Sequence, residues 1–113
     1  MNIAIVTGSR ADYGMLQWPL KVLREDIYFS VAEWNIWGAT ADQAMVAVKQ
    51  KLDEGRPDVV MLLGDRFEIM GAALACHLER VPIAHLCGGD VTEGSYDDAM
   101  RDCISRMASI HFV

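Results

Sequence analysis

Short runs of apolar, often β-branched residues alternate along the chain with segments in which apolar residues recur every three or four positions. The uninterrupted runs indicate strands buried on both faces of a parallel sheet, and the longer spacing indicates helices packed on that sheet. The strands are expected at 2–6, within 27–38, at 58–63, at 82–86 and from 110 to 113. The helices are expected after a loop at 8–14, at 40–54, at about 67–80 and at 97–108.

Local signals set the helix boundaries. Pro19 fits poorly inside a helix, so the first helix is expected to start late or to kink there. Thr40 and Gln43 have the spacing of a capping box, and Gly55 is expected to end the helix that they begin. The apolar side of the first helix is expected to carry Met15, Leu16, Leu20, Val22 and Leu23.

Strands that alternate with helices imply right-handed crossovers and a doubly wound parallel sheet, an α/β, Rossmann-like fold. Ligands of such sheets bind at the carboxyl ends of the strands. Three loops follow strands here, at 7–14, 64–68 and 87–98, and this fold gathers all three at one edge. We therefore expect the functional site at that edge.

The composition agrees with one folded domain. The chain has 113 residues, of which 52% are hydrophobic, and a net charge of -6. The acid excess argues against broad binding to nucleic acid or anionic membranes, and no apolar run approaches the roughly 20 residues of a membrane span. Three widely spaced cysteines favour reduced thiols in a cytoplasmic protein, with Cys76 and Cys103 as small core residues.

The loop after the first strand offers a possible anion site. It contains Gly8, Ser9, Arg10 and Asp12 just before a helix, where backbone N–H groups and an arginine suit phosphate. Neither the nucleotide-hydrolysing P-loop pattern nor the dinucleotide fingerprint is present. A glycine turn with Asp12 as an N-cap explains the same residues, and the sequence leaves both interpretations open.

The loop after the central strand carries Asp65, Arg66 and Glu68. Asp65 can act as an N-cap, with Glu68 complementing the helix dipole. Alternatively, a carboxylate in a partly dry cleft has a raised pKa and acts as an acid or base.

The densest polar cluster follows the fourth strand. His85, Asp90, Asp97, Asp98 and Arg101 lie beside several glycines. Crowded carboxylates are typical of acid–base sites, although Asp97 and Asp98 could simply complement a helix dipole. A metal site built on His85 and Asp90 is disfavoured, since the Asp-x-His and Asn-His pairs of metallophosphoesterases are missing.

Five motifs together make the chain resemble a known family. They are Thr7-Gly-Ser-Arg-Ala-Asp-Tyr-Gly14, Leu63-Gly-Asp-Arg-Phe-Glu68, Pro82-Ile-Ala-His85, Gly88-Gly-Asp-Val-Thr-Glu-Gly94 and Tyr96-Asp-Asp-Ala-Met-Arg101. In this order they resemble the hydrolysing UDP-N-acetylglucosamine 2-epimerases of sialic acid biosynthesis, a family with relatives that act on diacetylbacillosamine for legionaminic acid. The resemblance covers nearly the whole chain except residues 27–50.

The resemblance implies a glycosyltransferase-B-like architecture, in which a UDP-sugar lies between two Rossmann-like domains. It implies the conversion of UDP-N-acetylglucosamine and water to N-acetylmannosamine and UDP, by elimination of UDP and hydration of 2-acetamidoglucal. No metal and no redox cofactor is implied.

The resemblance also assigns residues. It implies catalytic carboxylates at Asp65, Asp90, Asp97 and Asp98, with the acid and base roles left open. The substrate-binding residues that it implies are Arg10, near the nucleotide phosphates, and Gly8, Ser9, Asp12, Arg66, Glu68, His85, Gly89, Thr92 and Arg101.

Several features depart from the family pattern. Asp90 stands where the family usually has Glu, and Asp102 where it usually has His. The stretch before the helix at 40–54 looks shorter by a strand-and-helix unit. The chain ends at Val113, without the nucleotide-binding C-terminal domain. We therefore expect a single domain over 1–113 with little or no activity by itself.

Two alternatives stay open. One is a glycosyltransferase-like domain of the same architecture. The other is a non-catalytic interaction module, with Trp34 and Trp37 either as contact anchors or as buried strand residues. As partners, the sequence favours a UDP-sugar together with either a second copy of the chain or the missing C-terminal domain.

Overall fold

A computed structural model of the chain describes all residues except 9, 64–65, 87–102 and 113; residues 10–13, 15 and 111–112 are described by their backbone. Strands and helices alternate as the sequence pattern predicts. In chain order they are β1 (Asn2–Thr7), α1 (Arg10–Glu25), β2 (Ser30–Asn35), α2 (Ala41–Glu54), β3 (Val59–Leu63), α3 (Phe67–Leu78), β4 (Ile83–Leu86) and β5 (Ile110–Phe112). Residues 103–107 form a further helical segment before β5.

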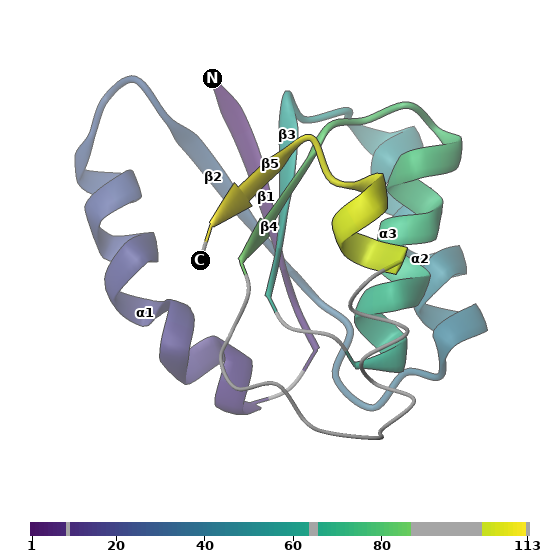
Figure 1. Cartoon of the computed structure of the whole chain (residues 1–113). Coiled ribbons are helices and arrows are strands. Elements are labelled where there is room, and N and C mark those ends of the chain that lie inside the picture. Colours follow the sequence, from purple (N-terminus) through teal and green to yellow (C-terminus); the bar gives the residue numbers. More distant parts are fainter. Residues whose placement is uncertain (9, 64–65, 87–102, 113) are drawn as a thin grey trace.

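The five strands form one parallel sheet in the order β2-β1-β3-β4-β5 (Figure 1). The prediction of a doubly wound α/β sheet is therefore confirmed. From β1 the chain crosses to β2 in one direction and then returns past β1 to β3. The crossover direction thus reverses between β1 and β3, which is the position where open α/β sheets bind their ligands.

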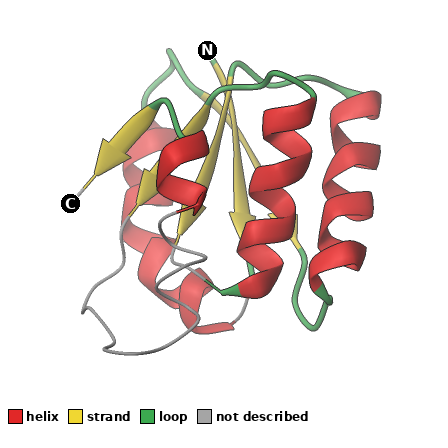
Figure 2. Ribbon diagram, turned by 45° about the vertical axis from the view of Figure 1, so that its right-hand side comes forward, coloured by secondary structure: helices red, strands yellow, loops and turns green. Residues whose placement is uncertain are grey.

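Helices cover both faces of the sheet (Figure 2). On one face, Leu16 and Leu20 of α1 pack against Ile3 and Ile5 of β1. On the other face, α2, α3 and Ile104 of the 103–107 segment cover a larger apolar cluster. Both faces of the central strands are thereby removed from water, and this explains why their sequences are continuously apolar.

Helices α2 and α3 approach each other very closely. A Cβ atom built at Gly71 of α3 would lie 2.1 Å from the carbonyl oxygen of Ala41, so only glycine fits there. The capping box predicted at the start of α2 is confirmed, since Thr40 Oγ1 accepts from the Gln43 N–H and Gln43 Oε1 accepts from the Thr40 N–H. Gly55 follows α2 as its C-cap, as predicted.

The first helix differs from its prediction. Helix α1 begins at Arg10, so Asp12 lies inside the helix and is not its N-cap, and the expected late start at Pro19 is wrong. Pro19 removes one helical hydrogen bond, but the burial of Leu16 and Leu20 outweighs that loss. Val22 is exposed, because it lies two positions from Leu20 and faces away from the sheet.

The cysteine predictions have mixed outcomes. Cys76 on α3 is fully buried, and this burial raises the pKa of its thiol to about 12. Cys103 is exposed, so its prediction as a core residue is wrong. Cys103 opens the 103–107 segment, in which Ile104 occupies the core position. Within the described part of the chain, no helix is long and apolar enough to cross a membrane.

Candidate functional site

The carboxyl edge of the sheet collects the described residues that the sequence analysis assigned to the site. Gly8 follows β1, Arg10 and Asp12 lie in the first turn of α1, and Arg66 and Glu68 lie at the start of α3. His85 lies on β4. The remaining predicted residues fall outside the described part of the chain; they are Ser9, Asp65, Gly89, Asp90, Thr92, Asp97, Asp98 and Arg101.

Glu68 is a buried carboxylate at this edge. Its side chain is 2% exposed, and neither carboxylate oxygen has a hydrogen-bond partner among the described residues. The side chain lies against Gly8, where a built Cβ atom would come within 2.9 Å of its Cγ and 3.0 Å of its Oε1. Gly8 is therefore needed for the close approach of this carboxylate to the end of β1. An unsatisfied buried carboxylate is costly, so Glu68 is a candidate functional residue.

Arg66 supplies the positive charge that pairs with the carboxylate of Glu68. Its Nε lies 2.7 Å from Glu68 Oε1, close enough for an ion pair, although the angle is not that of a hydrogen bond. The Arg66 side chain is more than half exposed, so much of it is accessible to solvent or to a ligand. Arg66 is the N-cap residue of α3 and makes no capping hydrogen bond with its side chain. The N-cap position predicted for Asp65 is therefore wrong, since the helix starts one residue later. Glu68 lies in the first turn of α3, as predicted.

The start of α1 adds a second feature for binding an anion. The helix begins at Arg10, directly after the residue that follows Gly8. Its first backbone N–H groups lie at the carboxyl edge, where they and the helix dipole favour negative charge. Together with Arg66, this arrangement suits a phosphate group between the ends of β1 and β3.

His85 lies beneath the edge rather than on it. It is 1% exposed, and its Nδ1 lies 3.2 Å from Ser105 Oγ in the 103–107 segment. This hydrogen bond ties β4 to the helical segment at 103–107. The contact with Ser105 therefore fixes the position of the His85 ring. The sequence did not reveal Ser105, because residues 20 positions apart in two different elements carry no local signal.

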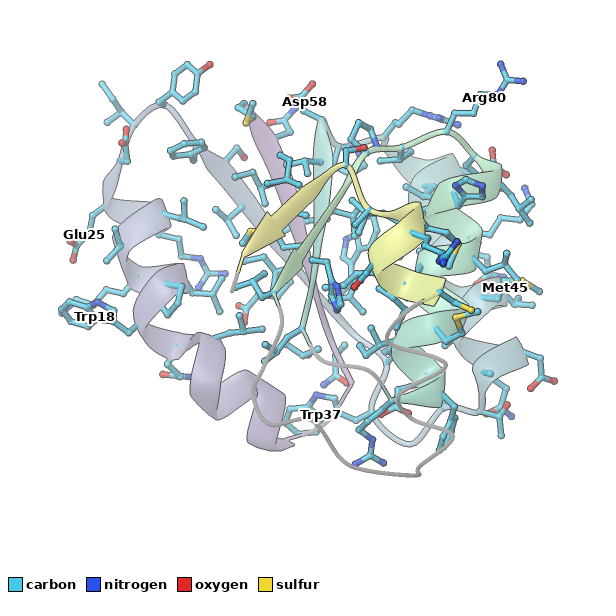
Figure 3. All side chains as sticks on the ribbon, viewed as in Figure 1. Trp18, Glu25, Trp37, Met45, Asp58 and Arg80 are labelled. Atoms are coloured by element: carbon cyan, nitrogen blue, oxygen red, sulfur yellow. The ribbon has the colours of Figure 1, made fainter. Side chains whose placement is uncertain are left out.

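Trp37 also lies at this edge, although the sequence analysis did not assign it to the site. It lies after β2 and is 40% exposed, so the prediction of a buried strand residue is wrong for Trp37 and right for Trp34. Its Nε1–H donates to Thr7 Oγ1 at 3.1 Å, which holds the ring beside the end of β1. Figure 3 shows Trp37 at the edge of the sheet where α1 begins.

The described residues contain no group of three or more His, Cys, Asp or Glu side chains placed to hold a metal ion. Two open grooves lie away from the carboxyl edge. One, of about 390 Å³, lies beside the amino ends of β1 and β2, and the other, of about 570 Å³, lies along α1. Neither groove is lined by a predicted site residue. We therefore locate the candidate functional site from the charged residues at the carboxyl edge of the sheet.

The fold as a whole is shared with solved enzymes. The UDP-GlcNAc 2-epimerase from Methanocaldococcus jannaschii matches 100% of this chain with a TM-score of 0.87 and 16% identity. The enzyme from Neisseria meningitidis, solved with bound UDP-GlcNAc, matches 100% with a TM-score of 0.87 and 17% identity. The chain corresponds to 39% and 40% of these two proteins. The fold of the chain is therefore that of an α/β part of these solved epimerases.

Sequence comparison assigns the family. The family described as UDP-N-acetylglucosamine 2-epimerase matches residues 2–113, and the chain belongs to this family. The hydrolysing UDP-N,N'-diacetylbacillosamine 2-epimerase of Legionella pneumophila is 32% identical over 149 positions, covering 99% of the chain and 39% of the relative. The hydrolysing GDP/UDP-N,N'-diacetylbacillosamine 2-epimerase of Campylobacter jejuni is 43% identical over 70 residues, or 62% of the chain and 18% of the relative.

These comparisons also describe the size of the chain. It spans about two fifths of the length of the Legionella relative. The match with that relative runs over more positions than the chain has residues, so the relative carries internal residues that this chain lacks. This is consistent with the short stretch noted before α2.

Proposed function

We propose that this chain is the N-terminal domain of a hydrolysing sugar-nucleotide 2-epimerase, which converts a UDP-N-acetylhexosamine and water to the 2-epimeric free sugar and UDP. The observation that carries this proposal is the family match over residues 2–113, with hydrolysing enzymes among the relatives. The buried Glu68 and the anion-binding features around it are the arrangement that such a reaction needs.

The reaction needs a base, an acid and anion binding. A base removes the proton at C2 while the C1–O bond to UDP breaks, which gives a 2-acetamidoglucal and free UDP. Water then adds its hydroxyl group to C1, and a proton reaches C2 on the face opposite to the one that lost it. This addition inverts C2 and releases the free sugar. Carboxylates held in a partly dry site are suited to both proton transfers.

The described residues support the departure of UDP. The backbone N–H groups at the start of α1 and the guanidinium of Arg66 both belong to the carboxyl edge of the sheet, where we propose that the diphosphate leaves. Both stabilise negative charge that develops as the C1–O bond breaks, so they favour the transition state over the bound substrate. In this proposal Glu68 holds the Nε side of Arg66 through their ion pair and leaves the other N–H donors of the guanidinium for the phosphate.

The proton-transfer roles belong to the residues implied by the family resemblance. We propose Asp65, Asp90, Asp97 and Asp98 as the carboxylates that move the C2 proton and assist the leaving group. We propose that a second domain following this chain holds most of the nucleotide, as the family architecture implies.

The test uses the full-length protein that contains this chain. It is incubated with UDP-N-acetylglucosamine, and separately with UDP-N,N'-diacetylbacillosamine, in deuterated water. We expect free 2-epimeric sugar that carries deuterium at C2, together with an equal amount of UDP. A nucleotide-linked epimer with no UDP release, or transfer of the sugar to an acceptor without epimerisation, would contradict the proposal.

A further inference from the structure

Trp37 is held rigidly although it lies after the end of β2. Its backbone N–H donates to Asn35 Oδ1 at 2.8 Å, and its Nε1–H donates to Thr7 Oγ1 at 3.1 Å. Thr7 is 2% exposed, so this anchor is itself fixed in the core. Gly38 then turns the chain toward α2 with a φ of 77°, a conformation that glycine adopts without strain. The indole ring is therefore fixed in position at the sheet edge.

The fixed ring presents apolar surface at the carboxyl edge. Trp37 keeps 40% of its surface exposed while its polar N–H is already bonded inward. The exposed part of the ring is thus carbon surface that gains free energy when a ligand covers it. Trp18 provides the contrast. It is 70% exposed on α1, its ring has Lys21 Nζ 5.7 Å from its centre, and it points away from the sheet (Figure 3).

We propose that Trp37 is the platform on which the N-acetylated sugar of the substrate packs, an inference that rests on the proposed function. The C–H groups on one face of a pyranose ring and the methyl of an acetamido group are the apolar parts of such a substrate. An indole face attracts them by dispersion and by its negative π surface.

The position of Trp37 favours the sugar as its ligand. Thr7, its anchor, ends β1 next to Gly8, against which Glu68 packs. The ring and the buried carboxylate therefore both lie next to the end of β1. A sugar whose diphosphate binds at the start of α1 would lie near both. Trp37 falls within residues 27–50, which carry none of the five motifs that support the family resemblance.

The proposal is tested by saturation-transfer NMR on the 113-residue chain with excess UDP-N-acetylglucosamine. We expect the acetamido methyl and pyranose protons to receive more saturation than the uracil protons. In Trp37→Ala the apparent affinity for the sugar nucleotide should fall about threefold to tenfold, because one stacking contact is lost. Trp18→Ala is the matched control, and its spectrum should equal that of the unaltered chain.

Two further variants separate packing from folding. Trp37→Phe keeps an aromatic ring and should retain most of the sugar signals, whereas Thr7→Val removes the anchor of Trp37 Nε1 and should weaken them. The amide spectrum of each variant reports whether the fold is kept. Unchanged sugar signals in a folded Trp37→Ala variant, or strongest saturation on the uracil protons, would overturn the platform.

The outcomes for this inference and for the proposed function are distinguishable. Trp37-dependent sugar signals without release of UDP by the full-length protein would support the platform and contradict the epimerase reaction. Release of UDP and epimeric sugar at equal efficiency by the full-length Trp37→Ala protein would support the reaction and overturn the platform.

Discussion

At the scale of one residue, Glu68 is a buried carboxylate that costs the fold stability at a candidate functional position. A carboxylate that is 2% exposed with no hydrogen bond to a described residue loses hydration without full compensation. Its one described partner is Arg66, at 2.7 Å. Gly8 makes room for it, since any side chain there would collide with the carboxyl group. Gly8 after β1 and Arg66 at the start of α3 thus both accommodate the charge of Glu68.

Glu68→Gln separates catalysis from stability. We expect kcat/KM of the full-length protein to fall by about tenfold or more, because Arg66 loses the charge that orients it. The free energy of unfolding should change by less than about 1 kcal/mol, since relief of carboxylate burial offsets the lost dipole interaction. Steady-state kinetics and urea unfolding measure the two quantities.

A matched control for this variant is Glu54→Gln, which alters an exposed carboxylate whose only described ion pair is 3.9 Å from Lys51. It should change neither quantity. Large destabilisation of Glu68→Gln with unaltered kinetics would make Glu68 a purely structural residue.

Cys76 gives a second prediction at this scale. Burial raises the pKa of its thiol to about 12, so at neutral pH the native thiolate fraction is about a thousandfold below that of an ordinary cysteine. Iodoacetamide should therefore label the exposed Cys103 of the native chain and spare Cys76 until urea unfolds the protein. Peptide mass spectrometry measures both rates. Comparable labelling of the two thiols in the native state would contradict the buried position of Cys76.

At the scale of elements, the contact between α2 and α3 depends on the absence of a side chain. The carbonyl of Ala41 occupies the space where a Cβ of Gly71 would stand. This contact sets the distance between the two helices that cover one face of β1 and β3. It therefore helps position the start of α3, where Arg66 and Glu68 lie.

Gly71→Ala should destabilise the chain by about 1–3 kcal/mol, because the helices must separate to admit the methyl group. Gly14→Ala is the matched control on α1, where a Cβ meets no atom within 4 Å. There the same change should stabilise the chain by about 0.5–1 kcal/mol through helix propensity. Thermal and urea unfolding measure both effects, and an equal sign for the two variants would contradict the contact.

At the scale of the whole molecule, the described residues form one five-stranded sheet, while the chain covers about two fifths of its Legionella relative. Two apolar clusters, one on each face, give it a core of its own. The proposed reaction, however, uses the binding energy of the entire nucleotide to stabilise its transition state. We therefore expect folding to require less of the protein than the proposed reaction does.

The 113-residue chain should unfold cooperatively and yet release UDP from UDP-N-acetylglucosamine at less than about a thousandth of the rate of the full-length protein, since several kcal/mol of nucleotide binding are missing. Coupled detection of UDP measures the rate, and circular dichroism measures the unfolding. Comparable turnover by the two proteins would show that this chain carries the complete site.

Element type and order followed from the sequence because they depend on local signals. Continuous apolar runs such as that of β3 require burial on both faces, and the Thr40–Gln43 pair states where α2 begins. The start of α1 could not be predicted from the sequence. Gly14 and Pro19 disfavour a helix locally, but the free energy gained by burying Leu16 and Leu20 is larger than that cost. Motif order likewise placed Gly8, Arg66 and Glu68 at one sheet edge.

The sequence by itself determined the fold class, the family and the edge of the sheet that carries the charged residues, since each is written in spacing and motif order. Only the tertiary structure decided which side chains meet. Glu68 is buried because Gly8 leaves room for it, and Trp37 remains at the edge because Thr7 accepts its N–H. Such contacts join residues 30 to 60 positions apart, and their energies arise from packing geometry that no local pattern encodes.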